Sequence, residues 1–123
     1  MKKIYIDYIC SLHGYLIRLK EIHWNTDKNG EHILCDEMMD ELAELEDEFA
    51  ECAMGLEGKH FKLGDLEPYV PNAEKLTPML KELEAETLKL HNELKSQHDM
   101  ELISILDDIV NFCNKYKYRS TQV

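Results

Sequence analysis

Four side chains in one predicted helix form two pairs of the kind that bind divalent metal ions. His32 and Asp36 are four residues apart, and so are Asp47 and Glu51. Residues at this spacing project side by side from one helix face, and imidazole with carboxylates suits iron and other divalent transition metals. The eleven positions from Asp36 to Asp47 span about 16 Å along a helix, whereas a metal–oxygen bond is about 2.1 Å long. One chain therefore cannot bring both pairs to one ion.

A second copy of the chain could complete each site. If the helix packs antiparallel on its copy across a two-fold axis, the His32/Asp36 pair of one chain meets the Asp47/Glu51 pair of the other, and the dimer holds two equivalent sites. His23, near the end of the preceding predicted helix, follows an inward-facing stripe and is expected to add a ligand. The predicted metal-binding residues are therefore His23, His32, Asp36, Asp47 and Glu51.

A metal-free interface is an alternative interpretation of the same helix. An acidic helix contains carboxylate pairs at this spacing by chance, and Asp47 with Glu51 alone is more typical of a solvated face. The small residues Ala43 and Ala50 lie in the same stripe, so the stripe could serve only to pack two copies together. The alternative function is then that of a metal-free helical-bundle dimer with a structural or interaction role.

A di-iron oxygenase built within one chain is the second alternative. That class places a Glu-x-x-His motif on each of two bundle helices. The sequence contains one such motif, Glu57-Gly58-Lys59-His60, in a glycine-flanked stretch. This alternative is therefore disfavoured.

Hydrophobic periodicity predicts an all-α fold of four helices in a single domain, residues 1–123. The predicted helices cover residues 4–25, 31–54, 78–95 and 99–118. Thr77 and Pro78 are expected as the N-cap and the first residue of the third helix. Short connections make the first two helices, and the last two, antiparallel neighbours. The long stretch between the second and third helices permits a crossover, so a ferritin-like four-helix bundle is expected.

The second helix should bury one seam and expose the opposite face. The apolar residues of the seam alternate three and four positions apart and are Cys35, Met38, Leu42, Leu45, Phe49, Cys52 and Leu56. The residues expected to face water are Glu37, Glu41, Glu44 and Glu48. The stripe with the metal-binding pairs lies on neither face, which leaves it free for a second copy.

The composition limits the partners and the compartment. The chain has 25 acidic and 14 basic residues, a net charge of -11, which argues against nucleic acid as a direct partner because phosphate binding needs clustered cations. No apolar run approaches the ~20 residues of a membrane span. The four cysteines contain no CxxC pair and suit reduced thiols in a cytoplasmic protein.

Other polar residues receive lesser roles. Glu46 or Asp40 could orient the metal-binding histidines. His13 is expected to fill core or surface space, and His91 and His98 are expected at the surface or at helix ends.

The spacing of the metal-binding residues resembles that of the Dps family of mini-ferritins. The matching pattern is His23-Trp24-Asn25 followed by His32, Asp36, Asp47 and Glu51, and the run Asp47-Glu48-Phe49-Ala50-Glu51 is similar to the D-x-x-A-E motif of the family. The resemblance covers residues 12–55 and the long connection that follows.

The resemblance implies an iron(II)-oxidising function at a di-iron site between subunits. His23, His32 and Asp36 would come from one subunit, and Asp47 and Glu51 from its two-fold mate. Family members use peroxide or oxygen as oxidant and store ferric mineral in a shell of twelve subunits, which limits peroxide and iron damage. Manganese or zinc would also accept these ligands. Because the chain begins without a lysine-rich arm, DNA binding is not expected, and the expected assembly ranges from a dimer to a cage of twelve.

Overall fold

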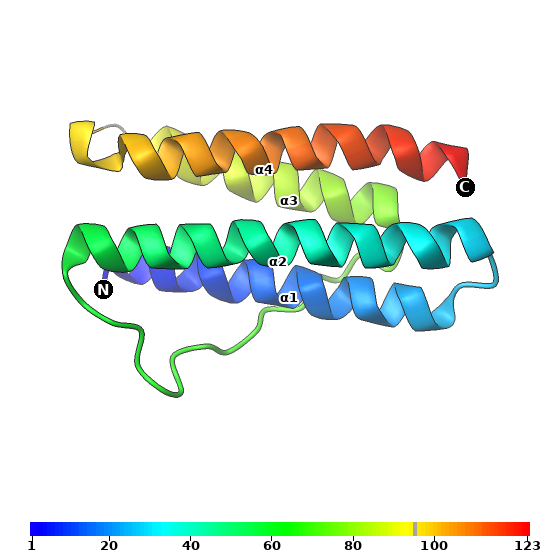
Figure 1. The fold of residues 1–123 in the computed structure, drawn as a ribbon, viewed down its shortest axis with the longest axis horizontal. Coiled ribbons are helices and arrows are strands. Elements are labelled where there is room, and N and C mark those ends of the chain that lie inside the picture. The colour runs from blue at the N-terminus through cyan, green and yellow to red at the C-terminus, as the bar shows by residue number, and fades with distance from the viewer. Residues whose placement is uncertain (95) are drawn as a thin grey trace.

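The computed structural model describes residues 1–94 and 96–123, and these are almost entirely helical (Figure 1). The elements are α1 (Lys3–Asn25), α2 (Asn29–Glu57), α3 (Leu76–Glu93), the 3-10 turn η1 (Gln97–Asp99), α4 (Met100–Arg119) and the 3-10 turn η2 (Ser120–Gln122). No strand occurs among the described residues, so the prediction of an all-α fold with four helices is confirmed. Within the same residues, no helix is both long enough and apolar enough to cross a bilayer.

The ends of the helices differ from the predicted ones by a few residues. α2 continues past the predicted end at residue 54 to Glu57, where Gly58 adopts the left-handed conformation (φ 63°) and ends the helix. α3 ends at Glu93; the last residue of its predicted range, Lys95, lies outside the described residues. α4 begins at Met100.

The predicted start of the third helix is wrong. α3 already begins at Leu76, and Lys75 occupies the N-cap position without a side-chain hydrogen bond. Thr77 instead shares a hydrogen bond of 3.2 Å with the hydroxyl of Ser120 at the end of α4. Pro78 is tolerated in the first turn because backbone N–H groups there have no partner within the helix.

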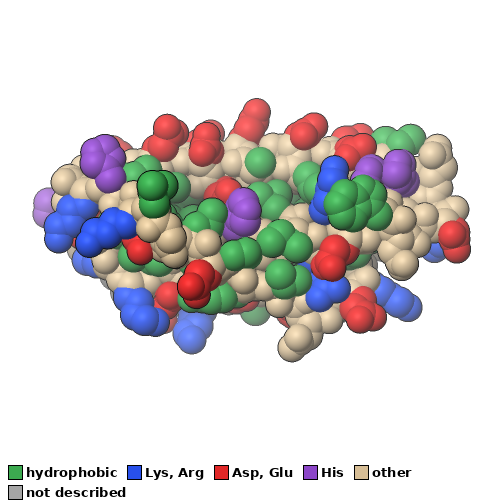
Figure 2. Space-filling view, turned by 90° about the horizontal axis from the view of Figure 1, so that it is seen from below, with side chains coloured by type: hydrophobic (Ala, Val, Ile, Leu, Met, Phe, Trp, Pro, Cys, Tyr) green, Lys and Arg blue, Asp and Glu red, His purple; other side chains and the backbone are tan. Residues whose placement is uncertain are grey.

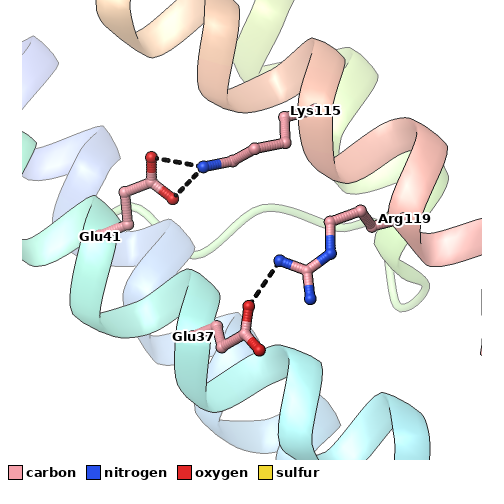
Figure 3. Close-up of polar contacts among 4 residues, drawn as sticks. All are labelled: Glu37, Glu41, Lys115 and Arg119. Atoms are coloured by element: carbon pink, nitrogen blue, oxygen red, sulfur yellow. Dashed lines mark hydrogen bonds and ion pairs between the residues drawn. The ribbon is translucent and has the colours of Figure 1, made fainter.

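The helices form two layers, α1 with α2 and α3 with α4, and the two helices of a layer run antiparallel (Figure 1). The layers pack on one apolar core to which all four helices contribute, and ion pairs also join α2 to α4 (Figure 3): Arg119 donates to Glu37, and the Lys115 ammonium lies 2.8 Å from a carboxylate oxygen of Glu41. Glu37 is exposed as expected, whereas Glu41 is only half-exposed, and both side chains also form ion pairs. Both remain partly exposed and join α2 to α4.

The predicted seam of α2 is buried over most of its length. Its buried residues are Leu34, Cys35, Met38, Leu42, Leu45, Phe49 and Ala53. The prediction fails at the end of the helix, where Leu56 is exposed and Cys52 is half-buried. A strict seven-residue repeat drifts by about 20° per heptad around a straight helix, so Ala53 takes the inward position.

The irregular segment 58–75 is fastened to the outside of α1 (Figure 1). The backbone N–H of Tyr69 donates to the carbonyl of Cys10 (3.1 Å). The guanidinium of Arg18 donates to the carbonyl of Pro71 (2.8 Å). Between them, Gly14 permits close approach, since a Cβ there would lie 2.0 Å from the Tyr69 carbonyl oxygen. One face of α1 therefore contacts backbone atoms of the segment.

Candidate metal centre

Two histidines at the junction of α1 and α2 hold each other in place. Nδ1 of His23 lies 2.8 Å from the backbone carbonyl of His32, and Nδ1 of His32 lies 2.8 Å from the carbonyl of His23. The two rings stack with their centroids 3.7 Å apart. Because a carbonyl oxygen only accepts, each Nδ1 carries the proton, and each Nε2 of a neutral ring keeps its lone pair. In the neutral ring, Nε2 of each histidine is therefore the nitrogen available to a metal ion.

Asp36 joins this pair one turn further along α2. Its carboxylate oxygen Oδ1 lies 3.7 Å from Nε2 of His23, and its side chain is 59% exposed. His23 is buried, whereas His32 is exposed. The structure thus brings together three of the five predicted ligands, at a place that is open to solvent on one side.

The other two predicted ligands lie elsewhere on α2. Asp47 and Glu51 are both exposed, and they lie about 16 Å and about 22 Å from Asp36 along the helix, at a rise of ~1.5 Å per residue. In the part of the chain that the structure describes, no group of three or more His, Cys, Asp or Glu side chains is arranged to hold an ion. A metal site that uses all five residues therefore needs a second chain.

The predicted role of Glu46 in orienting the metal-binding histidines is wrong. Glu46 is partly buried between α1 and α2, and its two carboxylate oxygens lie 3.3 and 3.2 Å from Nδ1 of His13. Burial raises the pKa of Glu46, while the hydrogen bond from His13 opposes that shift. His23 and His32 are instead oriented by backbone carbonyls, and Asp40 is exposed.

The pair of His13 with Glu46 was not predicted from the sequence. A usable signal was present, because His13 stands ten residues before His23 and Glu46 stands ten residues after Asp36. In an antiparallel pair of helices, a contact between His23 and Asp36 therefore predicts one between His13 and Glu46. A similar pair joins α3 to α4, where Nε2 of His91 lies 3.0 Å from Asp107.

The four cysteines are free thiols, as predicted. Cys10, Cys35 and Cys113 are buried, and Cys52 is half-buried. Burial raises the pKa of Cys35 and of Cys113 to about 12. Since the thiolate is the reactive form, these two side chains act as apolar core residues.

The surface that carries segment 58–75 has an apolar area and an acidic area. Figure 2 shows hydrophobic side chains in the middle of this face and acidic side chains along one long edge. The exposed apolar side chains of α1 and the segment include Trp24, Leu63, Leu66, Tyr69 and Val70.

A family model matches residues 23–119 and is described as a family of unknown function, DUF5856. The chain belongs to the DUF5856 family. The matched range contains all five predicted metal-binding residues and begins at His23. No curated protein and no solved structure is significantly similar to this DUF5856 chain.

Proposed function

We propose that this DUF5856 protein is a Dps-like iron(II)-binding and iron-oxidising protein whose dinuclear sites form between two chains. In each site, His23, His32 and Asp36 come from one chain, and Asp47 and Glu51 come from its partner. Iron is the substrate, and manganese or zinc could take its place. The proposed assembly is at least a dimer through α2.

The observation that carries the proposal is the reciprocal bonding of His23 and His32. Metal-binding histidines almost always donate their other ring N–H to a carboxylate, a backbone carbonyl or water, which fixes the ring and its tautomer. Here both Nδ1 atoms are committed to backbone carbonyls, so both Nε2 atoms are available beside Asp36. Asp47 and Glu51 are exposed on the same helix, as a site shared between chains requires.

Ferritin-like wiring is part of the proposal, and the path of segment 58–75 supports it. In Figure 1 the segment leaves the end of α2, passes along α1 and reaches the start of α3 towards the opposite end of the molecule. α2 and α3 then run in the same direction, as they do in bundles with one long crossover. A cytoplasmic location is proposed on the free thiols.

The proposed reaction oxidises two Fe(II) ions together. Each Fe(II) loses one electron, and one hydrogen peroxide accepts both electrons and two protons and becomes two molecules of water. Carboxylates favour this step because negative charge stabilises Fe(III) more than Fe(II). Peroxide reduced in a two-electron step releases no hydroxyl radical, which would explain a protective function.

Anaerobic Fe(II) titration followed by peroxide tests the proposal. The wild-type protein should oxidise Fe(II) with saturation, and the variant with Asp47→Ala plus Glu51→Ala should lose this activity because two of the five proposed ligands are gone. The matched control is Glu44→Ala plus Glu48→Ala, which removes the same charge at the same spacing from the neighbouring side of α2, along its groove with α4. Equal activity of the two double variants would contradict the proposal.

A metal-free dimer remains the second candidate function. It is supported by the small side chain of Ala43, which is exposed on α2 between the two ligand pairs and would let two copies pack closely. Measuring the metal content of the purified protein together with its native mass separates the two functions. A dimer without bound metal that also fails to bind added Fe(II) would establish this second function.

A further inference from the structure

The pair of His13 with Glu46 has the geometry of an oriented metal ligand. Nδ1 of His13 lies within 3.3 Å of both carboxylate oxygens of Glu46. The side chains of His13 and Glu46 are 37% and 18% exposed, so the carboxylate is the more enclosed of the two. When Nδ1 donates to Glu46, Nε2 of the neutral ring keeps its lone pair and can bind an ion.

A histidine held by a carboxylate is a recurrent arrangement behind metal ions. The carboxylate fixes the ring orientation and increases the basicity of the binding nitrogen. His13 has this carboxylate support, whereas His23 and His32 are supported by backbone carbonyls. In this respect His13 is built for metal binding at least as well as the two histidines already assigned.

The register of α1 against α2 places His13 at the level of the proposed site. His23 lies beside Asp36, and His13 lies beside Glu46, the residue before Asp47. In the proposed dimer, Asp47 of one chain lies opposite Asp36 of the partner subunit. Glu46 is one residue away, a rise of ~1.5 Å, so His13 comes to the level of Asp36 of the partner subunit.

If the α1–α2 layers of the two chains pack face to face, the two-fold axis also stacks α1 on α1. An axis that lies in the interface and runs perpendicular to the helices places each α1 against the α1 of the other chain, in the antiparallel direction. Since His23 shares the level of Asp36 within its own chain, His13 of one chain then lies opposite His23 of the partner subunit. Each site would then receive one histidine from the α1 of each chain.

We propose that His13, oriented by Glu46, is a further metal ligand of the site between the two chains. The inference rests on the proposed function, because the second chain brings the remaining ligands. Each site would then be held by His13, Asp47 and Glu51 of one chain, together with His23, His32 and Asp36 of the partner subunit. The added imidazole gives each dinuclear site a third nitrogen ligand, and both chains then contribute a histidine to each site.

Calorimetric titration of the native protein with Mn(II) tests this role without any need for oxidation chemistry. The variant His13→Gln keeps a donor for Glu46 and a similar volume but lacks the imidazole nitrogen. Its Mn(II) affinity should fall roughly 10–100-fold, with native mass unchanged. The matched control is His91→Gln, because His91 also bonds a carboxylate, that of Asp107, but lies on α3. The Mn(II) affinity of this variant should stay within about twofold of wild type.

The result also separates this inference from the proposed function. Glu46→Gln retains an acceptor for Nδ1 and should weaken Mn(II) binding less than His13→Gln does. Should both variants bind Mn(II) like the wild type while Asp47→Ala plus Glu51→Ala abolishes binding, His13 is no ligand and the proposed function stands. If Asp47→Ala plus Glu51→Ala leaves Mn(II) binding intact, the proposed function itself fails.

Discussion

At the scale of single residues, the polar side chains of the molecule are held by specific partners. His23 and His32 exchange hydrogen bonds with each other's backbone, so neither ring needs a further side chain to fix its orientation. Organisation before binding matters because the entropy of ordering a ligand side chain is then already spent on folding. The proposed metal site would therefore require little rearrangement within each chain.

Asp99 gives the fold a pH dependence in the acid range. Burial raises the pKa of this carboxyl group, but hydrogen bonds from Ser96 and Tyr5 outweigh burial and hold it below its ordinary value. An acid with a lowered folded-state pKa stabilises the fold above its unfolded-state pKa of about 3.9, and this contribution is lost as pH falls through the folded-state value. Asp99→Asn should therefore be less stable than wild type at neutral pH, and the difference should shrink in acid.

Urea unfolding at a series of pH values checks this expectation. Asp108→Asn is a suitable control because Asp108 is exposed on α4, and its stability should follow that of the wild type at every pH. A difference between wild type and Asp99→Asn that stays constant from neutral to acid pH would mean that the carboxylate charge has no part in the stability.

At the scale of elements, Gly14 decides how closely segment 58–75 can lie on α1. Alanine is the better helix former by about 1 kcal/mol, yet the added Cβ at this position would lie 2.0 Å from the backbone oxygen of Tyr69. We expect Gly14→Ala to lower the free energy of unfolding by about 1–3 kcal/mol, the usual cost of overpacking.

Gly55 provides the matched control for this element. It lies inside α2, and a Cβ there would meet nothing within 4 Å. Gly55→Ala should therefore raise the free energy of unfolding by up to about 1 kcal/mol. Both values come from chemical denaturation, and a stabilising Gly14→Ala would show that the segment is not held against α1.

The sequence predicts the helices better than the contacts between them. The apolar repeat from Cys35 to Phe49 is a local signal, and it predicts the buried face of α2 correctly. The contact of His13 with Glu46 depends on the register of two helices, which periodicity alone does not set. The attachment of segment 58–75 uses backbone atoms, and these have no side-chain signature apart from Gly14. Asp47 and Glu51 could be identified from the sequence as candidate ligands. The contacts they would make could not be predicted, because the proposed partner residues belong to another chain.

At the scale of the whole molecule, a mass measurement can test the proposed two-fold packing. Ala43 lies on α2 between the two ligand pairs and is exposed in the single chain. Ala43→Arg should therefore leave the fold intact but prevent two copies from packing through α2. The wild type should sediment as a particle of at least twice the 14.5 kDa chain mass, and the variant should sediment as a single chain.

The control for this measurement is Glu48→Arg, because Glu48 is exposed and borders a groove between α2 and α4. It should keep the mass of the wild type. A wild-type protein that sediments as a single chain, or an Ala43→Arg variant with unchanged mass, would rule out packing through α2.

The way segment 58–75 is attached has a consequence for how the protein can evolve. Because main-chain atoms hold it to α1, most of its side chains can be exchanged without loosening the attachment. Leu63, which is fully exposed, is thus open to mutational drift. New surface properties could be acquired there, one substitution at a time, while the helices beneath keep their shape.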